Sequence, residues 1–218
     1  MSYVLIAEKP DQAKKLAAPF KSKRGNGYIE VFPCETFPKG AYFTWCVGHL
    51  FGLQNPENYK DEWKKWSLTT LPILPEGNQF RYTIIKGKNT QYQVIKKLLK
   101  RPEISTIING CDAGREGEYI FGLVVQMSGV KKPIKRLWTS SLTKVAVKKA
   151  FDNLLPGSKT RSLFYEAQAR AIADWLVGLS TTRAYTLLLP GNKEVYSTGR
   201  IQTPLLALIN KRGRNRKF

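Results

Sequence analysis

The segment Cys111-Asp112-Ala113-Gly114-Arg115-Glu116-Gly117-Glu118 stands between two apolar runs of the chain. The run before it, Ile104 to Ile108, is short and rich in β-branched residues, as a buried parallel strand is. The run after it, Tyr119 to Val125, is long enough to be a packed helix. Glycines inside the segment allow the sharp turn that must join the two. The pattern predicts strand, turn and helix, the repeating unit of an α/β fold with a mainly parallel sheet.

The acids of this segment fall where ligands bind in α/β proteins. Asp112 lies just beyond the predicted strand, and Glu116 and Glu118 fall in or near the first turn of the predicted helix. Ligands of open α/β sheets sit outside the carboxyl ends of the strands. Carboxylates gathered there repel one another unless a cation neutralises them, and oxygen ligands suit Mg²⁺. Helix capping and the helix dipole would explain the same acids without a metal, so both interpretations stay open.

The start of the chain repeats this arrangement. Tyr3–Ala7 is a compact apolar strand, and Pro10 stands where the first residue of a helix is expected. Glu8 therefore follows a strand, as Asp112 does. If the two strands are parallel neighbours, Glu8, Asp112 and Glu116 form one cluster. The alternative for Glu8 is a solvated acid in a loop.

Strand and helix patterns alternate through the first part of the chain, which is typical of an α/β domain. A long connection over residues 54–77 interrupts them, and we expect its tryptophans, Trp63 and Trp66, to pack it on the sheet. Residues 21–27 are expected to form a polar turn. The other expected strands are 28–32, 41–47, 80–86 and 134–138, and the other expected helices are 11–20, 90–100 and 144–154.

The alternation stops at the Leu-Pro-Gly-Ser sequence of residues 155–158. A long helical stretch without proline follows, over residues 161–188. We therefore expect an α/β domain over residues 1–155 and part of a mainly helical domain over residues 156–218.

The composition favours a polyanionic partner. Lys and Arg number 36 against 16 Asp and Glu, which gives a formal charge of +20. Five of the positive charges lie in Lys211–Phe218, so most of the excess belongs to the rest of the chain. Binding to nucleic acid relieves the repulsion within such a basic body. The 10 Tyr, 10 Phe and 5 Trp offer faces for base stacking, although most are expected in the core.

Several classes of protein are excluded. The three cysteines, Cys34, Cys46 and Cys111, contain no CxxC pair, which argues against a zinc site and a disulfide framework. His49 is the only histidine, so a nitrogen-rich metal site is excluded. No apolar run is long enough to span a bilayer, and the first residues lack the layout of a signal peptide. We expect a reduced, cytoplasmic protein.

The second region has a polar set of its own. Arg170 and Asp174 lie four residues apart on one predicted helix face, where an ordinary surface ion pair is the simplest interpretation. Residues 196–204 form a turn rich in hydroxyls, with Arg200 and Gln202, ahead of an apolar run. Such a turn suits a phosphate, and it equally suits a helix N-cap.

With these residues assembled, the chain resembles the amino-terminal part of the type IA DNA topoisomerases, and among them the bacterial topoisomerase III group. The resemblance implies a Rossmann-like Toprim domain with a mainly parallel sheet, followed by part of a helical domain. It covers almost the whole chain to about residue 209. It rests on "VLIAEKP" (4–10), "CDAGREGEYIF" (111–121), "LWTSSLT" (137–143), "YEAQARAIADWLVGLSTTRAYT" (165–186) and "YSTGRIQTPLLALI" (196–209).

The resemblance implies roles for residues of the first domain. Asp112 and Glu116, near the catalytic Glu8, would hold Mg²⁺. Lys9 would lie against the scissile phosphate, and Arg115 would support the acidic loop.

The second region is implied to bind single-stranded DNA. The residues implied to contact the strand are Arg170, Asp174, Arg183, Ser197, Arg200 and Gln202. One departure concerns the metal: the family commonly carries a second aspartate where this chain has Gly114, which leaves the choice between one and two ions open.

In enzymes of this family a tyrosine attacks DNA and stays bound to the 5′ phosphate. That tyrosine lies in a domain after the "GRIQTP" segment. None of the ten tyrosines here matches that position. We therefore expect a fragment of a topoisomerase, without the remaining domains, that binds Mg²⁺ and DNA without relaxing DNA. The alternatives are a Toprim nuclease or primase and a non-catalytic DNA-binding module.

Overall fold

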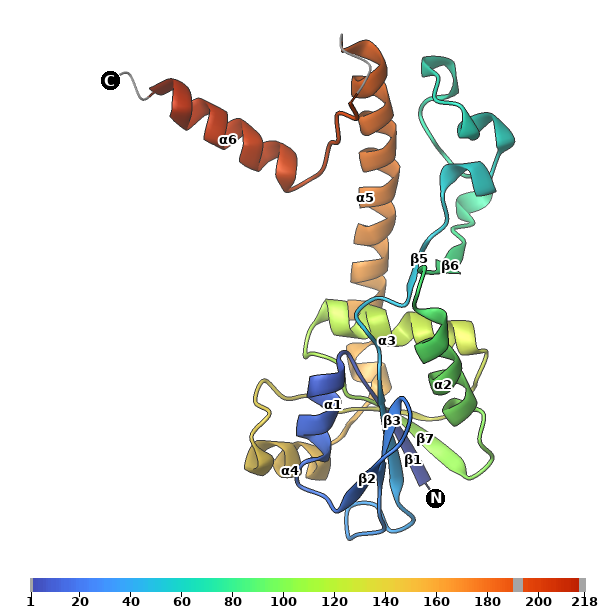
Figure 1. Ribbon diagram of the computed structural model, residues 1–218, viewed down its shortest axis with the longest axis vertical. Coiled ribbons are helices and arrows are strands. Elements are labelled where there is room, and N and C mark those ends of the chain that lie inside the picture. The colour runs from blue at the N-terminus through green and yellow to red at the C-terminus, as the bar shows by residue number, and fades with distance from the viewer. Residues whose placement is uncertain (1, 190–193, 216–218) are drawn as a thin grey trace. The chain divides into compact units, whose positions relative to one another are not determined.

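The computed structural model describes residues 2–189 and 194–215 (Figure 1). The chain divides into two compact units. The first contains Met1–Gly52 and Thr83–Gln168, and the second contains Leu53–Tyr82 and Ala169–Phe218. No helix among the described residues is both long and apolar enough to cross a membrane. The cytoplasmic location stays a prediction.

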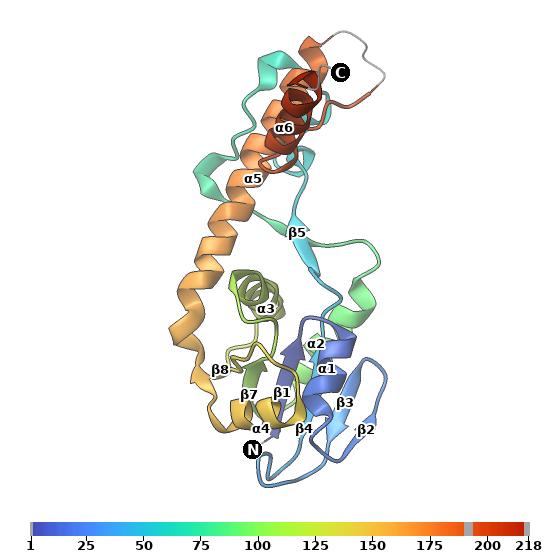
Figure 2. The same ribbon diagram turned by 90° about the vertical axis from the view of Figure 1, so that its left-hand side faces the viewer.

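The first unit is built on a seven-stranded sheet of order β2-β3-β4-β1-β7-β8-β9. Its central strands β4, β1, β7 and β8 are parallel (Figure 2). Towards the two edges, β2 and β3 on one side and β9 on the other each pair antiparallel with their neighbours. The mainly parallel α/β fold expected from the sequence is confirmed. The strands are β1 (Ser2–Ala7), β2 (Ser22–Arg24), β3 (Tyr28–Val31), β4 (Ala41–Trp45), β7 (Ile104–Asn109), β8 (Ile134–Arg136) and β9 (Leu155–Pro156).

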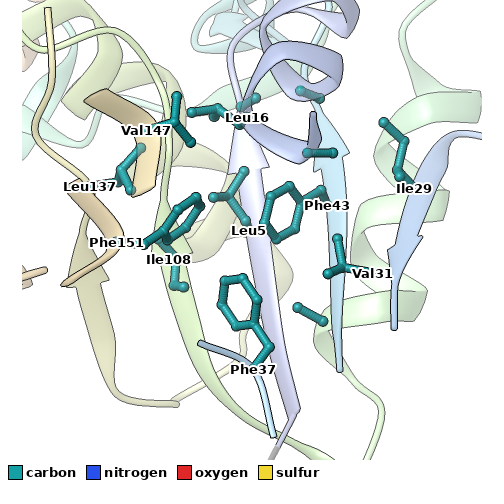
Figure 3. Packing of buried hydrophobic residues seen from close by; sticks show 14 of the residues in the cluster. Leu5, Leu16, Ile29, Val31, Phe37, Phe43, Ile108, Leu137, Val147 and Phe151 are labelled. Carbon is teal, nitrogen blue, oxygen red and sulfur yellow. The ribbon is translucent and has the colours of Figure 1, made fainter. Parts of the chain in front are cut away.

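Helices cover both faces of this sheet, as the continuous apolar strands require. On one face, α1 (Pro10–Ala17) and α4 (Lys144–Asp152) pack on Leu5 and its neighbours. Figure 3 shows Phe37, Phe43 and Phe151 around Leu5 in this layer. On the other face lie α2 (Asn89–Leu99) and α3 (Arg115–Ser128). Successive residues of β1 point to opposite sides of the sheet, so this strand contributes side chains to both layers.

The expected elements are largely confirmed, with ends that differ by a few residues. One difference is that the predicted polar turn before Tyr28 contains the short edge strand β2. A second sheet joins β5 (Phe51–Leu53) to β6 (Tyr82–Ile84), where the chain enters and leaves the second unit.

The connection after β5 was placed wrongly by the sequence analysis, because it belongs to the second compact unit and not to the sheet domain. Its Trp63 is buried, and the backbone carbonyl of Trp63 accepts a 2.7 Å hydrogen bond from Arg183. The Arg183 guanidinium also lies 5.2 Å from the ring centroid of Trp66. The short 3₁₀ turns of this connection are η1 (Pro56–Asn58), η2 (Asp61–Lys64), η3 (Leu68–Thr70) and η4 (Glu76–Asn78).

The remaining elements are η5 (Gly157–Thr160), the long helix α5 (Arg161–Leu188) and α6 (Gln202–Asn215). Helix α5 covers the range predicted from the sequence, and its residues from Ala169 onward belong to the second unit. The compact units therefore divide the chain differently from the predicted domains, 1–155 and 156–218. Part of the basic tail is helical in α6, and its residues 216–218 lie outside the described residues.

Candidate active site

The carboxyl ends of the central strands meet at one edge of the sheet. Strands β1 and β7 are parallel neighbours, with Ile6 opposite Asn109. Gly110 N–H donates a 2.9 Å hydrogen bond to the Ile6 carbonyl, so the chain after β7 leaves beside the chain after β1. On the other side of β1, Gly48 N–H donates to the Glu8 carbonyl at 3.3 Å. Glu8 and the acidic loop (residues 110–116) therefore share this edge, as the sequence analysis expected.

Gln12 joins the two chain segments directly. Its side-chain oxygen accepts a 2.8 Å hydrogen bond from Glu8 N–H, and its side-chain nitrogen donates a 2.8 Å hydrogen bond to Asp112 Oδ1. Glu8 and Asp112 are thus held to one residue of α1, although Asp112 lies 100 positions beyond Gln12 in the chain.

The acidic loop is built over a buried arginine. Arg136, at the end of β8, is 0% exposed. Its guanidinium donates to the carbonyls of Asn109, Cys111 and Leu137 at 2.7–3.0 Å and to that of Asp112 at 2.6 Å. Four backbone acceptors therefore fix the path of the chain from β7 into the loop.

Arg136 also neutralises a buried acid. Its Nε lies 2.5 Å from Oε1 of Glu118, which is 6% exposed in the first turn of α3. Burial raises the pKa of Glu118 above its ordinary value, and the Arg136 charge opposes that rise. Glu118 is therefore the buried ion-pair partner of the arginine that holds the loop.

Glycines allow the loop to fold back on α3. A Cβ at Gly117 would lie 2.1 Å from the Asp112 carbonyl oxygen, a distance that no side chain tolerates. At Gly114 a Cβ would meet nothing within 4 Å, and the backbone is extended with φ 169°. Gly114, where the resemblance implies a second aspartate, is therefore open to a side chain.

The other predicted residues of this edge lie on the surface. Glu116 is exposed, and its Oε2 lies 3.6 Å from Nε2 of His49, in the loop after β4. The exposed Lys9 ammonium lies 3.4 Å from Glu8 Oε1. Arg115 forms a 2.6 Å ion pair with Glu166.

The acids do not form a ready-made cage. Among residues 2–189 and 194–215, no group of three or more His, Cys, Asp or Glu side chains is placed to hold a metal ion. The donor set nevertheless suits Mg²⁺, because carboxylates are hard oxygen ligands and protein sites for this ion use one or two of them together with substrate phosphates. Asp112 and Glu116 are exposed at this edge and offer two such carboxylates.

In the second unit, Asp174, Arg200 and Gln202 line an open groove of about 870 Å³. At its rim, Arg200 donates to both carboxylate oxygens of Asp174, at 2.9 and 3.2 Å. This pair lowers the pKa of Asp174. Gln202 donates to the carbonyl and the hydroxyl of Ser197, so these two residues stabilise their own turn.

The two remaining predicted DNA contacts, Arg170 and Arg183, lie in different surroundings. Arg170 is half-buried on α5, close enough to Asp174 to lower the pKa of that acid further. Arg183 is only 4% exposed and holds the connection after β5, so its surroundings do not favour a DNA contact.

Gln12 and Arg136 were missed as site residues, and His49 was considered only as a reason against a nitrogen-rich metal site. Gln12 falls in the first turn of a helix, where glutamine is common on the surface, and Arg136 ends a strand whose pattern does not reveal a buried cation. Their positions in the sequence could have indicated them as site residues, because all three stand at or shortly after the carboxyl end of a central strand.

Two family models match the chain. The Toprim domain matches residues 3–142, and the DNA topoisomerase model matches residues 158–218. The chain therefore belongs to the Toprim family. The order of the two matches agrees with the resemblance described above.

Curated relatives agree with the family models. The chain is 42% identical over 212 residues to the DNA topoisomerase 3 of Bacillus subtilis and to that of Bacillus anthracis. Each match covers 96% of this chain, which spans only 27% of the length of those relatives. The fold is also similar to that of full-length topoisomerase I from Thermotoga maritima, with a TM-score of 0.63 over 97% of this chain and 30% of that one, at 23% identity.

Proposed function

We propose that this chain provides the Toprim site of a type IA DNA topoisomerase, which cleaves and rejoins single-stranded DNA through a 5′-phosphotyrosine. The observation that carries the proposal is the meeting of Glu8 and Asp112 at one sheet edge, both hydrogen-bonded to Gln12. In a doubly wound fold this edge is where ligands bind.

The reaction would be phosphoryl transfer from DNA to tyrosine and back. The tyrosine hydroxyl would lose its proton and its oxygen would attack the phosphorus. The phosphotyrosine bond would form as the bond from phosphorus to the 3′ oxygen breaks, and that oxygen would take up a proton. Glu8 and Lys9 are both candidates to supply that proton, and their charged groups lie 3.4 Å apart. The attacking tyrosine would come from a part of the enzyme beyond the matched segments.

Asp112 and Glu116, with Glu8 nearby, would hold Mg²⁺, which supplies electrostatic stabilisation to the phosphate groups. Lys9, with its exposed ammonium, would bind the scissile phosphate. The Asp174–Arg200 rim, Arg170 and the Ser197–Gln202 turn would contact the backbone of the strand. The high net charge of the chain, +20, supports a polyanionic partner.

The purified chain tests this proposal in two assays. Fluorescence anisotropy with a labelled single strand should show binding that weakens steeply with salt and strengthens with Mg²⁺. The same strand, denatured after incubation, should show neither cleavage nor a covalent adduct. Cleavage with an adduct would contradict the assignment of the nucleophile to another part of the enzyme.

The same assays separate the alternatives. Cleavage without an adduct would indicate a Toprim nuclease. Binding that is indifferent to Mg²⁺ and to Glu8→Gln would indicate a non-catalytic DNA-binding module.

A further inference from the structure

The side-chain amide of Gln12 makes two contacts at the sheet edge. Its carbonyl oxygen accepts from the backbone N–H of Glu8, and its amide nitrogen donates to the carboxylate of Asp112, both at 2.8 Å. The chemistry fixes the orientation of the amide, because an N–H can only donate and an ionised carboxylate can only accept. A flipped amide would lose both bonds.

Gln12 and its carboxylate partner Asp112 lie in different surroundings. Gln12 is 9% exposed and packs in the first turns of α1, whereas Asp112 is exposed. An exposed aspartate on a loop samples several side-chain orientations, and a bond from a buried amide restricts it to one. The hydrogen bond therefore transfers the rigidity of α1 to the acidic loop.

Capping of α1 explains only half of this arrangement. A glutamine in the first helical turn that reaches back to a backbone N–H stabilises the start of a helix. That role accounts for the Glu8 contact. It does not require the contact to Asp112, which follows β7, the parallel neighbour of β1.

We propose that Gln12 is a positioning residue for the site: it sets the distance and orientation of the Asp112 carboxylate relative to Glu8, so that both can act on one metal-bound phosphate. This inference rests on the proposed function. Carboxylates that hold metal ions are commonly hydrogen-bonded themselves, and removal of such a partner lowers metal affinity roughly 10–100-fold.

The test is a Mg²⁺ titration of the whole chain, followed through the backbone amide resonances of residues 110–117. Gln12→Met keeps the volume of the side chain and removes both hydrogen bonds. We expect it to weaken Mg²⁺ binding by roughly tenfold or more, while Mg²⁺-independent affinity for a single-stranded oligonucleotide stays unchanged. A residue that only supported folding would not separate these two affinities.

Two controls accompany it. Gln93→Met removes a 3.0 Å helix-surface hydrogen bond to Asn89 and should leave Mg²⁺ affinity unchanged. Gln12→Asn keeps an amide but is too short to bridge, and it should weaken Mg²⁺ binding in the same direction if the methionine variant fails to fold.

The outcomes separate this inference from the proposed function. If Asp112→Asn weakens Mg²⁺ binding and neither Gln12 variant does, the positioning role is wrong and the proposed function stands. If Asp112→Asn has no effect either, both are wrong.

Discussion

Arg136 Nε lies 2.5 Å from Glu118 Oε1, and neither residue is exposed by more than 6%. The pair joins the end of β8 to the first turn of α3, beneath the acidic loop. Because the same guanidinium binds the Asp112 carbonyl at 2.6 Å, the loop that carries the candidate metal ligand depends on a cation outside the acidic motif.

Replacement of Arg136 by methionine should destabilise the chain strongly. It leaves the Glu118 carboxylate buried without its ion-pair partner and removes a donor from four carbonyl groups. Loss of one partner of a buried ion pair costs about 3–5 kcal/mol. Urea unfolding measures this loss, and the exposed Lys135→Met is the matched control. A loss within about 0.5 kcal/mol of that control would contradict the role given to Arg136.

Gly117 and Gly114 should respond differently to replacement by alanine. Gly117→Ala forces a methyl group against the Asp112 carbonyl and should cost about 1–3 kcal/mol or more. Gly114→Ala adds a methyl group in open space on an extended backbone, so its effect should stay within about 0.5 kcal/mol. Thermal unfolding of the two variants gives the comparison. Equal melting temperatures would show that the loop does not fold against α3 as described.

Gly114→Asp should be accommodated and should increase Mg²⁺ affinity. The position has room for a side chain, and a further carboxylate beside Asp112 adds both charge and an oxygen ligand. Calorimetric titration with Mg²⁺ measures the change, and Gly114→Asn, similar in shape and uncharged, is the control. An aspartate variant with the same affinity as the asparagine variant would place the metal elsewhere.

The Asp174–Arg200 pair gives the second unit a measurable dependence on pH. Arg200 lowers the pKa of Asp174, so the pair stabilises its turn above the ordinary pKa of an aspartate and loses that effect as pH falls through the lowered value. Arg200→Gln should raise the Asp174 pKa toward its ordinary value in a carbon-detected NMR titration. Asp11, whose pKa is lowered by Lys15, should not change. An unchanged Asp174 pKa would mean that the pair does not form.

The parallel sheet could be predicted because its strands are short, apolar and followed by turn residues. The run Ile104–Ile108 and the run Tyr3–Ala7 became β7 and β1, and their adjacency brought Glu8 to the edge that carries Asp112. The long helix without proline was equally clear, since its predicted range matches α5.

The missed features depend on contacts that local patterns do not encode. Arg136 is buried because the loop carbonyls and Glu118 surround it, and a strand pattern reports only alternation and apolarity. The connection after β5 was assigned to the sheet on the strength of its tryptophans, whereas Trp63 lies with Arg183 in the second unit. Both errors involve partners more than ten residues away in sequence.

The central claim, that Asp112 beside Glu8 binds a divalent ion for DNA chemistry, is tested most directly by a crystal structure of the chain with Mn²⁺ and a short single strand. The anomalous signal of Mn²⁺ locates the ion without ambiguity. We expect a peak in direct contact with the Asp112 carboxylate and with a phosphate oxygen of the strand. A strand bound at this edge with no peak there, or a peak held only by other residues, would contradict the claim.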